Sequence, residues 1–253
     1  MRPSTPDCLL EGVYQRAGLR QMLEFQEVHT YYGNSHILQG VSFKVNESSV
    51  GVLLGRNGMG KSTTLHSAIG FAPPAKGNVF FKGEDITRLS SYRIAMRGMA
   101  LVPQGCRIFP SLTVKENLLI AARRGRNGKG WTLEKVFELF PVLMHRQTHR
   151  GNHLSGGERQ MLAISRGLIS NPDFLLLDEP TEGLAPLVIQ ELGRIIGRVK
   201  SLGLSILMAE QNFAFALGIA DRVCILHKGT VVFRGLPKEL EINKEIQDLY
   251  LAI

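Results

Sequence analysis

The fold is decided by the stretch Gly55-Arg56-Asn57-Gly58-Met59-Gly60-Lys61-Ser62, which fits the phosphate-binding pattern G-x-x-x-x-G-K-[ST]. The apolar residues 50–54 precede it and indicate a buried strand, and residues 63–69 indicate the first turns of a helix. Glycines let such a loop curl until its N–H groups and the helix N-terminus point at phosphates. Lys61 is expected to reach the β- and γ-phosphates, and the Ser62 hydroxyl to ligate Mg²⁺. The alternative is a glycine-rich turn without a ligand, but strand, full motif and helix in this order favour a nucleoside triphosphate site.

A second cluster indicates hydrolysis. The apolar residues 174–177 read as a buried strand that ends in Asp178-Glu179-Pro180. Two carboxylates at the carboxyl end of such a strand are typical of the magnesium and water side of a P-loop site. Asp178 is expected to hold the metal through water, and Glu179 to polarise the attacking water.

A third motif, Leu154-Ser155-Gly156-Gly157-Glu158-Arg159-Gln160, reads as a turn that opens a helix. The Ser155 hydroxyl and the Gly157 N–H would lie at the helix N-terminus and form a second anion site.

These motifs, in this order, resemble the ATP-binding subunits of ABC transporters over nearly all of residues 22–253. The resemblance implies that Glu179, Gln211 and Gln104 act in catalysis, and that Ser62, Gln104 and Asp178 hold Mg²⁺. Tyr32 matches the aromatic residue that stacks on adenine. The resemblance assigns ATP contacts to Tyr32, Gly55, Arg56, Asn57, Gly58, Met59, Gly60, Lys61, Ser62, Thr63, Ser155, Gly156 and Gly157.

Within that family, residues 104–110, 182–186 and 210–212 resemble the branched-chain amino-acid importers, in particular their second ATPase subunit (LivF type), with urea importers close behind. The implied function is an energy-coupling ATPase that converts ATP and water to ADP and phosphate. Two alternatives remain: the same subunit serving urea, short amides or a lipid exporter, and a soluble ABC ATPase of DNA repair or translation. The latter proteins usually carry two cassettes or long coiled-coil insertions, and this chain has neither.

Two residues depart from the usual ABC pattern. Gln211 stands where most of these ATPases have a histidine, and its amide can donate a hydrogen bond but cannot carry a proton. Whether this chain's own ATP site is fully active is therefore left open. Gly167 interrupts the helix after the third motif at a cost of ~1 kcal/mol relative to alanine, and the sequence offers no functional reason for it.

The family pairs two cassettes head to tail, because the phosphate loop and the Ser-Gly-Gly turn of one chain lie too far apart to grip one ATP. The resemblance thus implies a second ABC ATPase chain, two permease subunits and, indirectly, an external substrate-binding protein. Ile108 and Phe109 are candidates for the permease contact or, with equal weight, for the subdomain core. The expected location is the cytoplasmic face of the inner membrane, with the chain cytoplasmic when alone.

Composition agrees with these expectations. No run of the 253 residues approaches the ~18 apolar residues of a membrane-spanning helix, so membrane association should be peripheral. The three cysteines, Cys8, Cys106 and Cys224, are widely spaced and indicate a reducing compartment without a thiolate metal site. The net charge of +8 is dispersed except near residues 123–129, which read as a solvated basic loop, so no nucleic-acid partner is expected.

The predicted fold class is α/β: a P-loop NTPase core with a mostly parallel sheet, an antiparallel β layer and an inserted helical subdomain. Residues 1–21 are expected to be a disordered N-terminal extension, residues 22–253 the ABC domain, and residues 90–168, approximately, its helical subdomain. Short strands are expected at residues 25–28 and 41–45, and hairpins at 79–83 and 223–233. Helices are expected from the capping box at residues 113–116, at 133–140 ending at Pro141, and at 187–199, with a core strand at 205–208.

Overall fold

The structure, a computed structural model, describes residues 20–125 and 130–251. Its strands form two sheets, a six-stranded one in the order β10-β9-β3-β8-β7-β6 and a four-stranded one in the order β2-β1-β4-β5. The strands are β1 (Gln21–Tyr32), β2 (Ser35–Asn46), β3 (Val50–Leu54), β4 (Lys76–Phe81), β5 (Glu84–Asp85), β6 (Met99–Val102), β7 (Phe174–Asp178), β8 (Ser205–Glu210), β9 (Arg222–His227) and β10 (Thr230–Gly235).

The six-stranded sheet is parallel except for β10, which pairs antiparallel with β9. Every residue of β3, β7 and β8 is buried, because both faces of the sheet are covered. Val52 and Leu54 contribute to the core beneath the helices on one face, whereas Leu53 between them joins the core shared with the four-stranded sheet. This double burial explains why these strands read as unbroken apolar runs.

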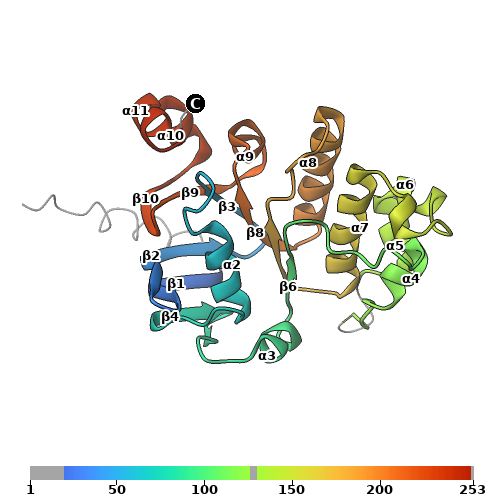
Figure 1. Cartoon of the computed structure of the whole chain (residues 1–253), viewed down its shortest axis with the longest axis horizontal. Helices are drawn as coiled ribbons and strands as arrows, with labels where there is room; N and C mark the ends of the chain where they lie inside the picture. The colour runs from blue at the N-terminus through green and yellow to red at the C-terminus, as the bar shows by residue number, and fades with distance from the viewer. Residues whose placement is uncertain (1–19, 126–129, 252–253) are drawn as a thin grey trace, which may run out of the picture.

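Helices pack against the six-stranded sheet (Figure 1). Helix α2 contacts β6, β7 and β8, α7 contacts β6 and β7, and α9 contacts β3. Helices α4 to α7 gather at the end of the molecule away from the four-stranded sheet. The helices are α2 (Lys61–Ile69), α3 (Ser91–Met96), α4 (Val114–Leu119), α5 (Leu133–Leu139), α6 (Pro141–His145), η3 (Gly151–His153), α7 (Gly156–Ile169), α8 (Pro186–Ser201), α9 (Phe213–Ile219), α10 (Pro237–Ile242), α11 (Lys244–Ile246) and η4 (Gln247–Leu251).

The antiparallel layer is larger than predicted. The short strands expected at residues 25–28 and 41–45 are the centres of two 12-residue strands, β1 and β2. Register shifts interrupt their pairing, and Glu27 has φ 47° at one of them. Because each bulge resets the alternation of buried and exposed side chains, the sequence pattern indicates only part of each strand.

The helical region also differs in detail from the prediction. The expected subdomain at residues 90–168 includes β6, which pairs with β7 in the six-stranded sheet, so the helical excursion from that sheet starts after Val102. The capping box is present, since the Thr113 side chain accepts a hydrogen bond from the Glu116 N–H and the Glu116 side chain accepts one from Thr113. Pro141 begins a further short helix, α6, because proline suits the first position of a helix.

Gly167 has a packing role. A Cβ atom at this position would lie 2.8 Å from Val102 Cγ2 and 3.0 Å from Leu175 Cδ1. The glycine therefore lets α7 approach β6 and β7 more closely than an alanine would, which accounts for its place inside a helix.

Strand β1 begins at Gln21, one residue before the expected domain boundary. The remainder of the predicted extension, residues 1–19, lies outside the described residues, as do residues 126–129 of the expected basic loop. Within residues 20–125 and 130–251, no helix combines the length and apolar character needed to cross a membrane.

Candidate ATP-hydrolysis site

The phosphate loop joins β3 to α2, as predicted. Gly60 precedes the helix with φ 104°, a conformation that favours glycine. The turn between β9 and β10 holds the loop in place: the Gly229 N–H donates to the Met59 carbonyl at 3.1 Å, and the Lys228 N–H contacts Met59 Sδ at 3.2 Å. The loop is thus fixed both by its own helix and by a hairpin distant in sequence.

Lys61 lies inside the curve of this loop. Its Nζ donates to the carbonyls of Gly55 at 2.8 Å and Arg56 at 3.1 Å, and lies 3.1 Å from Glu179 Oε1. The side chains of Lys61 and Glu179 are only 3% and 6% exposed. The structure therefore brings the predicted phosphate-binding lysine and the predicted catalytic carboxylate into direct contact.

Ser62 and Asp178, the two residues predicted to serve Mg²⁺, also meet. The Ser62 hydroxyl donates to Asp178 Oδ1 at 3.0 Å. Burial raises the pKa of Asp178, and the neighbouring Glu179 charge adds to that effect, while the Ser62 hydrogen bond opposes it. Hydroxyl and carboxylate oxygens are ligands that Mg²⁺ prefers, and a cation here would offset the repulsion between the two carboxylates. The residues present fit the predicted ion.

Three predicted site residues contact the Glu179 carboxylate. In addition to Lys61, its Oε2 accepts from Gln211 Nε2 at 2.9 Å and from Gln104 Nε2 at 3.3 Å. Its backbone has φ 47°, which is uncommon for a residue with a side chain. The Glu179 N–H donates to the Ala209 carbonyl at 2.9 Å, so the backbone that orients this carboxylate is tied to β8.

Gln104 and Gln211 approach Glu179 from different loops. Gln211 Nε2 also lies 2.6 Å from Asn57 Oδ1 and so joins the phosphate loop to the carboxylate. Gln104 also donates to Glu182 Oε2 at 2.9 Å. Gln104 thus contacts two carboxylates rather than Ser62 or Asp178, the other predicted metal ligands.

Tyr32, the predicted adenine contact, lies at the end of β1 and is 47% exposed. Its hydroxyl is 3.2 Å from His66 Nδ1 on α2. Thr63, on the same helix, is buried. The ring of Tyr32 therefore lies beside the helix that follows the phosphate loop, and its stacking on adenine stays a prediction.

The Ser-Gly-Gly turn begins α7, as expected. Ser155 caps this helix: its Oγ accepts from the Glu158 N–H at 3.2 Å, and the Ser155 N–H donates to Glu158 Oε2 at 2.7 Å. Gly156 has open space around the position of a Cβ atom. Helices α2 and α7 lie on opposite sides of β6 in Figure 1, and each of the two predicted anion sites is at the N-terminus of one of these helices.

The two candidates for the permease contact, Ile108 and Phe109, differ in their surroundings. Ile108 packs against the main core, whereas Phe109 is 43% exposed and has the Arg166 guanidinium 4.6 Å from its ring centre.

The nearby Cys106 thiol donates to Gln160 Oε1 at 2.8 Å, and burial raises its pKa. Cys106 is thus a half-buried thiol that packs against α7.

One residue of this site, Glu210, was not identified from the sequence. Glu210 ends β8, is 1% exposed, and accepts hydrogen bonds from Thr181, Gln211 and Asn212. Burial raises its pKa, while the hydrogen bonds from Thr181, Asn212 and Gln211 oppose that rise. The signal was present, since Glu210 follows the apolar run of β8 just as Asp178 follows that of β7.

Comparison with known proteins agrees with this geometry. The family model described as "ABC transporter" matches residues 38–182, a span that contains the phosphate loop, the Ser-Gly-Gly turn and both carboxylates. The chain belongs to the ABC transporter family. It is 41% identical over 232 residues to the high-affinity branched-chain amino acid transport ATP-binding protein BraG of Pseudomonas aeruginosa, a match that covers 91% of this chain and 100% of BraG.

Other ABC proteins are also similar to this ABC ATPase. The probable branched-chain amino acid transport protein LivF of Archaeoglobus fulgidus is 36% identical, with 92% of this chain and 99% of LivF covered. The lipopolysaccharide export protein LptB of Haemophilus influenzae is 33% identical, with 87% and 93% covered. A nucleotide-free cassette from an ABC transporter superposes with a TM-score of 0.78 at 26% identity, covering 92% of this chain and 99% of that one.

These findings confirm the predicted fold class and activity. The chain has the ABC ATPase fold, with a mostly parallel sheet and an antiparallel β layer, and is the ATP-binding subunit of an ABC transporter. It hydrolyses ATP to drive transport.

Proposed function

We propose that this ABC ATPase drives the import of branched-chain amino acids. The observation that carries the substrate class is the 41% identity to BraG over the whole of that protein, supported by the 36% identity to LivF. Export of a lipid is the second candidate, favoured by the 33% identity to LptB. Urea or short amides remain the third.

In the proposed mechanism, the loop amides and Lys61 bind the phosphates of ATP. Ser62, Asp178 and Gln104 would hold Mg²⁺, and its positive charge would stabilise the negative charge on the transferred phosphoryl group. Glu179 orients a water molecule and accepts its proton as the water oxygen bonds to the γ-phosphorus and the bond to ADP breaks. Gln211, which already contacts Glu179 and Asn57, donates a neutral hydrogen bond toward the γ-phosphate.

The proposed site is completed by a second ABC ATPase chain. Supporting this, α2 and α7 lie apart within one chain (Figure 1), and the exposed N-terminus of α7 could bind the phosphates of an ATP held by another cassette. One solved ATP-binding cassette bound to ADP and phosphate is described as dimeric. The proposed assembly adds two permease subunits, which place the ATPase peripherally on the cytoplasmic face of the membrane, with Phe109 at the contact and an external binding protein delivering substrate.

Uptake measurements test the substrate class. We expect deletion of the gene in its own organism to abolish high-affinity uptake of labelled leucine, isoleucine and valine, and wild-type protein to restore it. The Glu179→Gln variant, expressed at the same level, should fail to restore it. Unchanged uptake of these amino acids, together with lost urea uptake or an outer-envelope lipid defect, would assign the protein to one of the other two candidates.

A further inference from the structure

The Glu210 carboxylate joins two loops at the carboxyl end of the six-stranded sheet. Its Oε1 accepts from the Thr181 N–H at 3.1 Å. Its Oε2 accepts from the Thr181 hydroxyl at 2.9 Å, from the Gln211 N–H at 3.0 Å and from the Asn212 N–H at 3.2 Å. All four donors are neutral, and three of them are backbone groups, so this carboxylate fixes backbone rather than pairing with a cation.

Both loops carry residues of the proposed chemistry. Thr181 lies two residues after Glu179, and Gln211 directly follows Glu210. The amide of Gln211 contacts the Glu179 carboxylate at 2.9 Å, a contact that persists only while the two loops keep their relative position. Thr181 and Glu210 are 6% and 1% exposed, so water is largely excluded from the two bonds to Thr181, whereas the bonds from the Gln211 and Asn212 N–H groups are part-buried.

We infer that Glu210 is a positioning residue for ATP hydrolysis. It holds the backbone at Thr181 and at Gln211 so that the Glu179 carboxylate and the Gln211 amide face the same point beside the phosphate loop. Glu210 acts through these residues and itself touches neither the nucleotide nor the attacking water. The inference rests on the roles proposed above for Glu179 and Gln211.

A purely structural carboxylate would behave differently. Removing it would leave buried N–H groups unpaired and lower the stability of the fold, but the folded fraction would hydrolyse ATP normally. A positioning residue instead lowers kcat in fully folded protein much more than it alters the KM for ATP, because the Glu210 carboxylate itself contacts neither the phosphate loop nor Lys61. The split between kcat and KM therefore separates the two roles.

Glu210→Gln is the informative substitution, since it keeps the shape of the side chain. In one orientation the new amide nitrogen faces the Thr181 N–H, and in the other it faces the three donors that now bind Oε2. Either way a donor meets a donor, so the loops must shift. We expect a roughly 10²-fold fall in kcat, a loss that a displacement of about 1 Å in a catalytic group can cause, with a much smaller change in KM.

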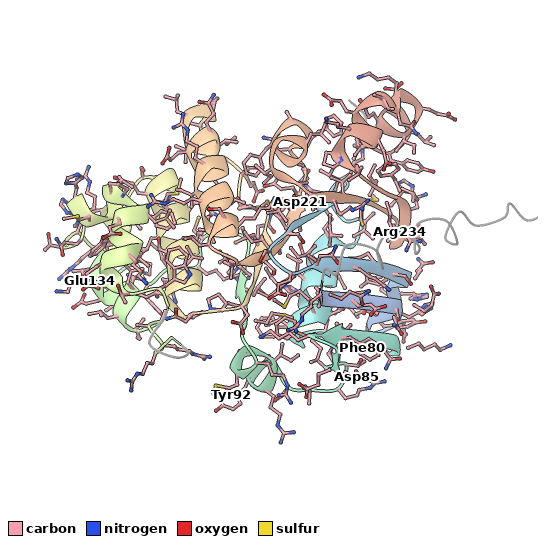
Figure 2. The ribbon with its side chains drawn as sticks, turned by 180° about the vertical axis from the view of Figure 1, so that it is seen from behind. Phe80, Asp85, Tyr92, Glu134, Asp221 and Arg234 are labelled. Carbon is pink, nitrogen blue, oxygen red and sulfur yellow. The ribbon has the colours of Figure 1, made fainter. Side chains whose placement is uncertain are left out.

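Asp221→Asn is the matched control. Asp221, labelled in Figure 2, accepts from the Val50 N–H at 2.8 Å and from Lys200 Nζ at 2.6 Å, at the opposite ends of the parallel strands. Its loss should lower the melting temperature without lowering kcat. The fall in kcat of the double variant Glu210→Gln/Gln211→Ala should be smaller than the product of the two single effects, because Glu210 acts in part through Gln211.

Turnover is measured in the assembled transporter with the catalytic glutamate of the second ATPase chain removed and with Glu179→Gln as reference, and the folded fraction of each variant is determined by circular dichroism. A wild-type kcat in Glu210→Gln, a fall no larger than in Asp221→Asn, or single effects that multiply in the double variant would each overturn the inference. Loss of turnover in Glu179→Gln beside normal turnover in Glu210→Gln overturns this inference alone. Normal turnover in Glu179→Gln removes the proposed role of Glu179 and the inference with it.

Discussion

Lys61 and Glu179 form a nearly buried ion pair, with Nζ 3.1 Å from Oε1. The same ammonium group is expected to bind the γ-phosphate of ATP. The carboxylate and the phosphate therefore compete for one cation, and ATP binding must weaken the contact between Lys61 and Glu179.

The first prediction follows from this competition. Glu179→Gln removes the negative charge beside Lys61, so it should tighten ATP binding by on the order of tenfold, or ~1.4 kcal/mol, while abolishing most hydrolysis. Lys61→Ala should weaken ATP binding instead. Equilibrium titration with a fluorescent ATP analogue measures both effects. Weaker binding in Glu179→Gln would show that the pair does not compete with the nucleotide.

The second prediction concerns Gln211. Its amide bridges Asn57 and Glu179 at 2.6 and 2.9 Å, so Gln211→Ala should reduce turnover ~10²-fold, the usual effect of losing one transition-state donor. Gln211→His, which retains a donor, is the control and should retain most activity. Both are measured in the assembled transporter with the catalytic glutamate of the second ATPase chain removed. Normal turnover in Gln211→Ala would mean that this amide is dispensable at the site.

The third prediction concerns the metal. Ser62→Ala removes the hydroxyl that contacts Asp178 at 3.0 Å, so the Mg²⁺ concentration for half-maximal hydrolysis should rise. Ser62→Thr keeps the hydroxyl and should behave like the wild type. Chelation by EDTA should stop hydrolysis in all three proteins. An unchanged Mg²⁺ requirement in Ser62→Ala would exclude this hydroxyl as a ligand.

The fourth prediction concerns packing at Gly167. Alanine gains about 1 kcal/mol in helix propensity, but overpacking a core costs ~1–3 kcal/mol, and the new methyl group would lie 2.8 Å from Val102 Cγ2. Gly167→Ala should therefore be destabilising by on the order of 1 kcal/mol in urea unfolding. Gly197 on α8 has open space around its Cβ position, so Gly197→Ala should stabilise the protein. Stabilisation by both substitutions would contradict the packing role of Gly167.

The fifth prediction concerns pH. Burial raises the pKa of Glu210 above its ordinary value, so the folded protein binds this proton more tightly than the unfolded chain does. Stability from this group is then present below the ordinary carboxyl pKa and is lost as pH rises through the folded value. The unfolding free energy of the wild type relative to Glu210→Gln should accordingly decrease as pH rises through this window. An increase would mean that the hydrogen bonds outweigh the burial.

The phosphate loop, the carboxylates and the parallel sheet could be predicted because each is encoded locally. The residues that make up each motif lie within a few positions of one another. This holds for the glycines of the loop, for the apolar run before Asp178, and for the capping pair Thr113 and Glu116. In the same way, unbroken apolar runs indicate strands that are buried on both faces.

The contacts among loops could not be predicted from local patterns. Gln211 and Asn57 are 154 positions apart in sequence, and Glu210 and Thr181 are 29 positions apart. Only the parallel register of β3, β7 and β8 brings the members of each pair together. The lengths of β1 and β2 were underestimated because bulges interrupt the alternation of side chains. Gly167 had no explanation until its neighbours Val102 and Leu175 were placed beside it.

The positive φ of Glu179 has a consequence for protein engineering. Glycine or asparagine would suit a backbone with φ 47° better than glutamate does, so a design method that matches residues to backbone conformation will tend to choose them at position 179. Such variants would relieve the backbone strain but would lose the carboxylate and leave the buried Lys61 ammonium without its ion pair. Efforts to stabilise this cassette should hold position 179 fixed and seek their gains at sites such as Gly197.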